Sequence, residues 1–223
     1  MNAARTGLRA ARQNLAAGLL LQSIALALIL SYYLIPTVGA RLDDLGSLNE
    51  RWSPWLAIAL TVLFGGIIPL GVEALQAAKR QQPQRSVAQL LFTLLVWGIN
   101  GALTAWLYQY QASLFGSAPT VSTVIKKVLV DQFIWVPLYV VPFFTLIFLW
   151  RDQQFSYQGL RTALQERSFW DRALPLMISN WAVWIPAVSI IYAFPTSLQI
   201  ILMNLILVFW SLILTIFVSD SNS

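Results

Sequence analysis

The chain has 223 residues, of which 58% are apolar and 10% are charged, and it contains no Cys and no His. A soluble domain usually carries about 25% charged residues, so this composition is far from that of a soluble protein. Without Cys or His the chain has no thiolate nucleophile, disulfide, zinc site of the usual ligands, His-ligated haem or Ser-His-Asp triad.

Five stretches of the chain contain no charged residue, and the longest of them run over 86–125 and 173–219. A helix needs about 20 apolar residues to cross a hydrocarbon layer of ~30 Å, so each stretch is long enough for a crossing, or nearly so. We therefore predict an all-α, polytopic transmembrane helical bundle in which residues 1–223 form a single integral membrane domain. About six spans are expected, over residues 17–34, 54–75, 87–110, 128–149, 173–194 and 197–218.

The segments between and within these spans carry turn and anchor residues. After the first span, residues 35–51 predict a short polar loop, and Trp52 and Trp55 then open the second span as interfacial anchors. Pro137 and Pro142 lie inside the fourth span, where proline kinks a helix and frees backbone carbonyls.

Two polar segments each allow two interpretations. Residues 151–172 are either a short helix lying in the membrane interface or a solvated loop. Residues 1–16 place Arg5, Arg9 and Arg12 on one helical face, which suits either a mitochondrial transit segment or a positively charged flank of the first span.

The positions of the 14 basic residues predict the orientation of the bundle. Alternating spans place ten of them on one side and four on the other, so the positive-inside rule puts both the N and C termini on the inside face. The net charge of +5 therefore reflects topology, and nucleic acid is not an expected partner. The four on the outer side are Arg41, Arg51, Lys126 and Lys127.

Two acidic residues lie inside the predicted spans, where a charge costs about 2.5–3.5 kcal/mol on insertion scales. Glu73 lies near the inner end of the second span, and we expect it to reach headgroup water. Asp131 follows Lys127 by four residues, a spacing that predicts an ion pair on one helical face. The two acids lie near opposite membrane faces, which argues against paired acid-base catalysis. The amides of Asn100 and Asn180 also lie within spans, where such groups usually join helices.

The segment from Lys127 to Pro137, with Asp131-Gln132 between them, resembles the lysine-to-DQ-to-proline signature of the Mpv-seventeen and twenty-two-kilodalton peroxisomal membrane protein family. A second similarity to this family is the Asn-Trp-x-x-Trp-x-Pro pattern of residues 180–186, followed by a Trp in the last span. The chain departs from the family pattern where Ile185 separates Trp from Pro and where Ser211 follows Trp210.

The resemblance implies a compact helical membrane protein that forms a weakly selective channel for small solutes, without catalytic chemistry or a cofactor. No metal site is expected, and the motifs of known hydrolases are absent, so we do not expect an enzyme. The alternative is a non-catalytic structural, assembly or lipid-organising protein. The residues expected to line a pore or to form a structural motif are Lys127, Asp131, Gln132, Pro137, Asn180, Trp184, Pro186 and Trp210, with Glu73 and Asn100 as secondary candidates.

The expected partners are the lipid bilayer and, for a channel, small solutes, while a homo-oligomer is left open. A bacterial chain would lie in the cytoplasmic membrane. A eukaryotic chain would lie in a mitochondrial inner, peroxisomal or plastid membrane.

Overall fold

The structure is a computed structural model that describes the backbone of residues 15–220 and, between residues 19 and 208, the side chains of all but Leu21. Every regular element in this part of the chain is a helix, which confirms the predicted all-α class. The two interpretations of residues 1–16 concern residues that lie almost wholly outside it. The elements are α2 (Leu15–Leu34), α3 (Pro36–Trp52), α4 (Trp55–Thr61), η1 (Val62–Ile67), α5 (Ile68–Lys79), α6 (Val87–Phe115), α7 (Val121–Val130), η2 (Asp131–Val140), α8 (Val141–Asp152), α9 (Tyr157–Glu166), α10 (Phe169–Ile191) and α11 (Thr196–Asp220).

Four continuous helices in the described part of the chain are long and apolar enough to cross a membrane. They are Trp55–Lys79, Val87–Phe115, Val121–Asp152 and Phe169–Ile191. A fifth is counted if α2 and α3, which bend by 105° relative to one another, form one broken span. The apolar helices are those of a membrane protein, and the count of six spans stays a prediction.

The predicted polar loop after the first span is wrong, because these residues form helix α3. Pro36 stands in the first turn of α3, where a missing N–H costs nothing. Gly46 and Asn49 are buried against the start of α11, and Asn49 Nδ2 donates a hydrogen bond of 2.8 Å to the carbonyl of Ser197. A side chain on Gly46 would approach the hydroxyl of Ser197 to 2.8 Å. Contacts with a distant helix therefore order a segment whose composition is typical of a loop.

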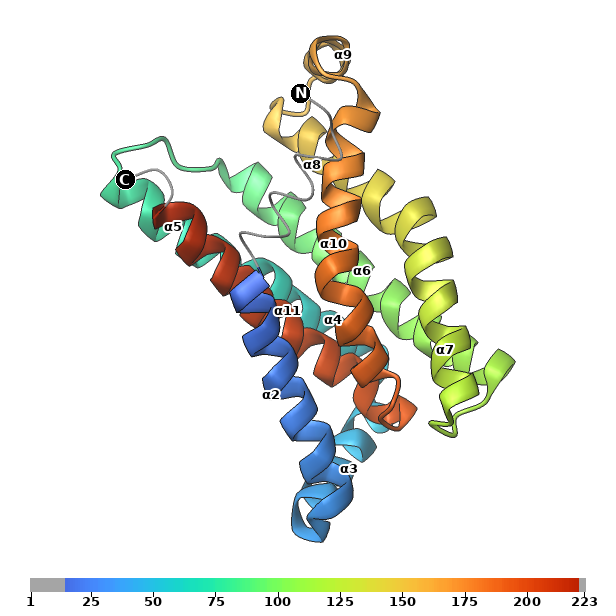
Figure 1. The fold of residues 1–223 in the computed structure, drawn as a ribbon. Coiled ribbons are helices and arrows are strands. Elements are labelled where there is room, and N and C mark those ends of the chain that lie inside the picture. The colour runs from blue at the N-terminus through green and yellow to red at the C-terminus, as the bar shows by residue number, and fades with distance from the viewer. Residues whose placement is uncertain (1–14, 221–223) are drawn as a thin grey trace.

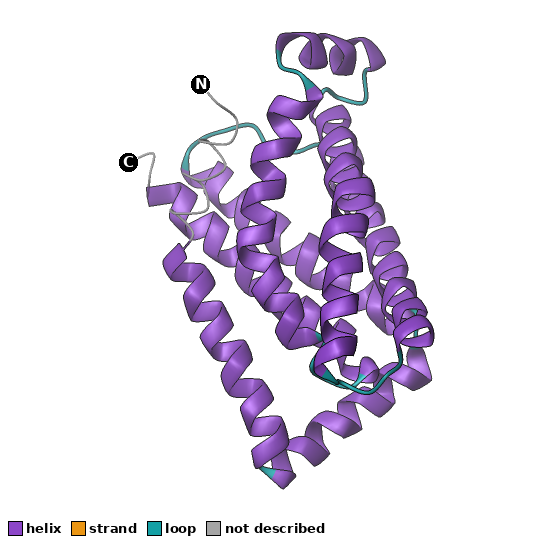
Figure 2. Ribbon diagram, turned by 45° about the vertical axis from the view of Figure 1, so that its right-hand side comes forward, coloured by secondary structure: helices purple, strands orange, loops and turns teal. Residues whose placement is uncertain are grey.

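The helices run between two ends of an elongated bundle (Figures 1 and 2). Helix α9 and the connection between α5 and α6 lie toward one end, while α3, the start of α7 and the turn from α10 to α11 lie at the other. Helix α11 packs against α2, α3, α4, η1, α5, α6 and α10, and its side chains Leu198, Gln199 and Asn204 are fully buried. This helix is the centre of the packing.

Two stretches of wider, π-helical backbone interrupt the long helices. In η2, Pro137 has no N–H to donate to the carbonyl of Gln132, which is its partner in the i to i+5 pattern. The indole Nε1 of Trp181 in α10 donates to that carbonyl instead, at 2.8 Å. In η1, Gly65 and Gly66 lie under the side chain of Trp97, and a Cβ on Gly65 would approach its ring to 2.5 Å. Both stretches thus depend on contacts with a neighbouring helix.

Residues 151–172 contain a helix, α9, as one of the two interpretations expects. Ser156 caps it by accepting a hydrogen bond from the amide of Gly159, and Ala163 is its buried residue. Tyr157 at its start is 77% exposed. The helix lies beyond the end of α8, which it contacts (Figure 1).

Candidate functional site

A cavity of about 440 Å³ lies within the bundle, between α6, η2, α8, α10 and α11. Its volume falls in the usual range for small-molecule sites, roughly 300–1,000 Å³. Five of the ten candidate residues predicted from the sequence line it, and they come from α6, η2 and α10: Asn100, Asp131, Gln132, Asn180 and Trp184. The structure therefore gathers half of the predicted site residues around one space.

Asp131 is the one charged residue among the described residues that line this cavity, and it is 6% exposed. Its Oδ2 accepts a hydrogen bond of 2.6 Å from the hydroxyl of Tyr192, and its Oδ1 accepts one of 2.8 Å from Nε2 of Gln132. The hydroxyl of Tyr192 in turn accepts from Nε2 of Gln111, at 2.8 Å. This chain of hydrogen bonds joins η2, the end of α10 and α6, because Asp131 and Gln132 lie in η2, Tyr192 directly follows α10, and Gln111 lies in α6.

The predicted ion pair between Lys127 and Asp131 is wrong, since none joins these two residues in the described part of the chain. Lys127 is 1% exposed and its Nζ lies 5.8 Å from the centre of the Tyr192 ring, a cation–π contact. Lys127 is in the last turn of α7, whereas Asp131 begins the wider backbone of η2 and its carboxylate accepts a hydrogen bond from the hydroxyl of Tyr192. One tyrosine, directly after the end of α10, thus contacts both charged side chains.

Two buried polar atoms of the cavity lining lack a hydrogen-bond partner: Oε1 of Gln132 and Nδ2 of Asn180. Leaving such a group unpaired costs about 1–3 kcal/mol. Native structures usually satisfy buried polar atoms with protein, water or a ligand. The free acceptor and the free donor therefore make this cavity a candidate for a polar guest.

The other walls of the cavity are formed by aromatic and aliphatic side chains. Trp97 and Phe144 lie with their ring centres 5.1 Å apart, and Trp135 lies 4.4 Å from the ring of Tyr139. Phe148 and Trp184 complete the aromatic lining. The cavity thus has polar groups from three helices set into walls that are mostly aromatic and aliphatic.

A second cavity, of about 480 Å³, lies at the end of the bundle that holds α3. It is polar, with Asn49 and Glu50 on α3, Gln109 on α6 and Ser197 at the start of α11 among its lining residues. Tyr108 lines both cavities. Its side chain is 3% exposed and packs edge-on against the ring of Tyr192, with centres 5.4 Å apart. The linings of the two cavities therefore share this aromatic residue.

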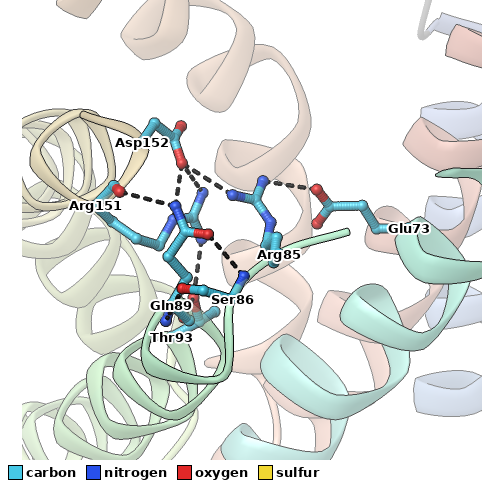
Figure 3. Close-up of polar contacts among 7 residues, drawn as sticks. All are labelled: Glu73, Arg85, Ser86, Gln89, Thr93, Arg151 and Asp152. Carbon is cyan, nitrogen blue, oxygen red and sulfur yellow. Dashed lines mark hydrogen bonds and ion pairs between the residues drawn. The ribbon is translucent and has the colours of Figure 1, made fainter. Parts of the chain in front are cut away.

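A network of charges at the α9 end holds the helix ends together (Figure 3). Arg85, in the connection between α5 and α6, lies between Glu73 at 2.6 Å and Asp152 at 3.0 Å. Burial lowers the pKa of the Arg85 guanidinium, but its contacts with the two carboxylates raise it, and its pKa lies above the ordinary value. The side chain of Glu73 is half-exposed, which leaves it open to the predicted contact with headgroup water, and it also forms an ion pair with Arg85.

Arg151 at the end of α8 extends this network into the bundle. It is 7% exposed, and its side chain binds the Asp152 carboxylate at 2.8 Å and donates to the hydroxyl of Thr93 at 2.9 Å. Gln89 donates to its carbonyl at 3.0 Å and also forms a capping box with Ser86 (Figure 3). The network fixes the start of α6 against the end of α8, so its role is structural.

The remaining predicted residues lie apart from the cavity or outside the described side chains. Pro137 and Pro186 lie in η2 and α10 without lining the cavity, and the side chain of Trp210 is not described. Sequence reasoning missed Tyr108 and Tyr192 as functional candidates. Tyr108 carried a faint signal, because Leu107-Tyr108 is similar to a Trp-Tyr pair of the resembling family.

Comparison with protein-family models, with curated proteins and with solved structures finds no match to this chain. The resemblance to the Mpv-seventeen and twenty-two-kilodalton peroxisomal membrane protein family therefore rests on the motifs named above and stays a prediction.

Proposed function

We propose that this chain is an integral membrane protein that conducts small polar solutes through its helical bundle. The observation that carries the proposal is the pair of cavities that share Tyr108 in their linings. One is lined by polar residues at the α3 end, and the other is lined by residues of the long helices α6, α10 and α11 and of η2 and α8. Helical membrane proteins place irregular or polar groups at membrane depth mainly where these line a cavity or pack inside protein.

The proposed orientation follows from the charges at the two ends. Arg41 and Arg51 on α3 and the lysines of α7 lie at the end with the polar cavity, and most basic residues of the described chain lie toward the α9 end. By the positive-inside rule the α9 end is the inner face, and the polar cavity is an outer vestibule. Six spans with both termini inside fit this assignment, as does membership of the family that the motifs resemble.

We take Tyr108 as the group that closes the proposed connection between vestibule and cavity. It lines both spaces, and its buried ring packs against the ring of Tyr192. A pore that is closed by one or two buried rings widens when a ring is removed, so the side chain of Tyr108 is the group whose truncation tests the path.

Efflux of graded neutral solutes from liposomes that contain the purified chain measures this path. Tyr108→Ala is expected to raise the efflux rate several-fold above that of the natural chain. Tyr110→Ala is the matched control, because Tyr110 lies two residues further on α6 but is 47% exposed and stacks on Trp106. Absence of efflux through both the natural chain and Tyr108→Ala, with folded protein shown by circular dichroism, would refute the proposal.

A structural or assembly role is the second candidate, and the hydrogen-bonded chain from Gln111 through Tyr192 to Asp131 favours it. Such buried networks join helices and specify their packing. In that role, variants of these residues lose stability in detergent while no solute crosses the membrane in either protein.

A further inference from the structure

The cavity presents a carboxylate that is not neutralised by an ion pair. Asp131 is hydrogen-bonded to two neutral groups, the hydroxyl of Tyr192 and the amide of Gln132. No ion pair to it exists among the residues that the structure describes, and the side chain is almost completely buried. A buried charge is costly unless it is paired, so this arrangement is suited to a guest that brings a positive charge.

We propose that the inner cavity binds a small organic ammonium ion, with its N–H groups directed at Asp131 and Gln132. Gln132 lines the cavity together with Asp131, and its Oε1 is a covered acceptor without a hydrogen-bond partner, so that a turn of its amide presents this acceptor to a guest. A primary ammonium has three donors and no acceptor, so one donor can reach Oδ1 or Oδ2 of Asp131 while another reaches Oε1 of Gln132. The guest would thereby satisfy the free acceptor and the uncompensated charge together.

The aromatic walls favour the same class of ligand. The rings of Trp97, Trp135 and Trp184 face a cavity whose negative group is Asp131. The faces of aromatic rings attract cations, most strongly for Trp, and aromatic cages are a common way to hold an ammonium group. The apolar share of the lining also suits the carbon skeleton of an organic amine better than a hydrated metal ion, which needs several oxygen ligands.

Lys127 is the group that opposes a cation at this site. It does not line the cavity, and it lies against the ring of Tyr192, the same residue whose hydroxyl binds Asp131. Its charge nevertheless repels a cation near Asp131. Removal of the Lys127 charge should therefore tighten the binding of an ammonium ion, a result that a merely structural role for Lys127 does not produce.

The test is isothermal titration of the purified full chain in detergent with benzylammonium and with benzyl alcohol, its neutral counterpart, against a blank of empty micelles. Benzylammonium should bind at least about tenfold more tightly, since it brings a positive charge and three donors to the carboxylate, whereas the alcohol brings one donor and no charge. Asp131→Asn should remove this preference, while its side-chain carbonyl can still accept from Tyr192. Glu73→Gln is the matched control, because it removes a carboxylate that lies outside the cavity, and it should leave the preference intact.

Lys127→Gln is the second variant, and it should bind benzylammonium several-fold more tightly than the natural chain. Equal affinities for the two probes, or an unchanged preference in Asp131→Asn, would overturn the ammonium site. The ammonium site depends on the proposed function in one respect only: the amine is a transported solute if the bundle conducts solutes. Binding without efflux from liposomes would refute the path and keep the site, whereas efflux of neutral solutes without amine binding would refute the site alone.

Discussion

Removal of the hydroxyl group of Tyr192 should destabilise the bundle more than any other loss of a single oxygen atom around the inner cavity. Tyr192→Phe keeps the ring, and with it the packing against Tyr108 and the contact with Lys127. It deletes the 2.6 Å hydrogen bond to Asp131 and the 2.8 Å hydrogen bond from Gln111. All three partners are nearly or completely buried, so water does not readily replace the missing oxygen.

The magnitude follows from the two groups that lose a partner. A hydrogen bond to a charged group contributes about 1.5–3 kcal/mol, and a buried neutral donor left unpaired costs about 1–3 kcal/mol. Gln111 already has an unpaired Oε1, so its amide would then lack any described side-chain partner. Because such terms add incompletely for groups in contact, we expect the free energy of unfolding to fall by about 3 kcal/mol.

Reversible unfolding of the purified chain in mixed detergent micelles, followed by circular dichroism, measures this difference. Tyr108→Phe is the control, because Tyr108 is just as buried and its hydroxyl forms no hydrogen bond with another described residue. It should cost less than about 1 kcal/mol. If Tyr192→Phe were within 0.5 kcal/mol of Tyr108→Phe, the hydroxyl of Tyr192 would not be the link between the three helices, and the reasoning would fail; that margin is about the scatter of neutral surface substitutions.

Two further substitutions test the packing on which the cavity depends. Gly65→Ala should lower the free energy of unfolding by about 1–3 kcal/mol in the same assay, because the new Cβ would lie 2.5 Å from the Trp97 ring and overpack the contact. Gly71→Ala is the control: a Cβ there has no atom within 4 Å, so this substitution should be neutral or slightly stabilising. Equal effects of the two would show that η1 does not press against α6. Arg151→Met should lower the free energy of unfolding by about 2–3 kcal/mol through the loss of its buried contacts with Thr93 and Asp152, and Arg161→Met on exposed α9 should change it by less than about 0.5 kcal/mol. A loss as small for Arg151 as for Arg161 would contradict a structural role for the network at the end of α8.

The pattern of charges predicted the class of fold because the membrane imposes a simple rule on it. Long uncharged stretches must be helical in lipid, since each backbone polar group needs an internal partner. The same rule says nothing of a segment such as Pro36–Trp52, which has ordinary polar composition. Its helix is packed through Gly46 and Asn49 against Ser197, which lies about 150 residues later in the chain. A local sequence pattern gives no information about a contact between such distant residues.

The site shows the same division between local and distant information. The sequence identifies Asp131, Gln132 and Asn180 as candidate site residues, because an acid or an amide inside an apolar span is costly and usually has a functional or packing role. Their partners are not recognisable, because Tyr192 and Tyr108 are ordinary aromatic residues in a chain in which 13% of residues are aromatic. The spacing of four residues between Lys127 and Asp131 predicted an ion pair between them, and the spacing carries no information on Tyr192.

The structure resolves that assignment through geometry that no spacing rule includes. Pro137 cannot donate to the carbonyl of Gln132, the backbone takes the wider π-helical form from Asp131 onward, and Trp181 satisfies the carbonyl. Tyr192, directly after the end of α10, donates to Asp131 with its hydroxyl and contacts Lys127 with its ring. The proline that the sequence marks as a kink thus lies in a π-helical stretch that begins at the acid six residues before it, and the partner of that acid is a tyrosine about 60 residues later in the chain, a contact that no spacing rule contains.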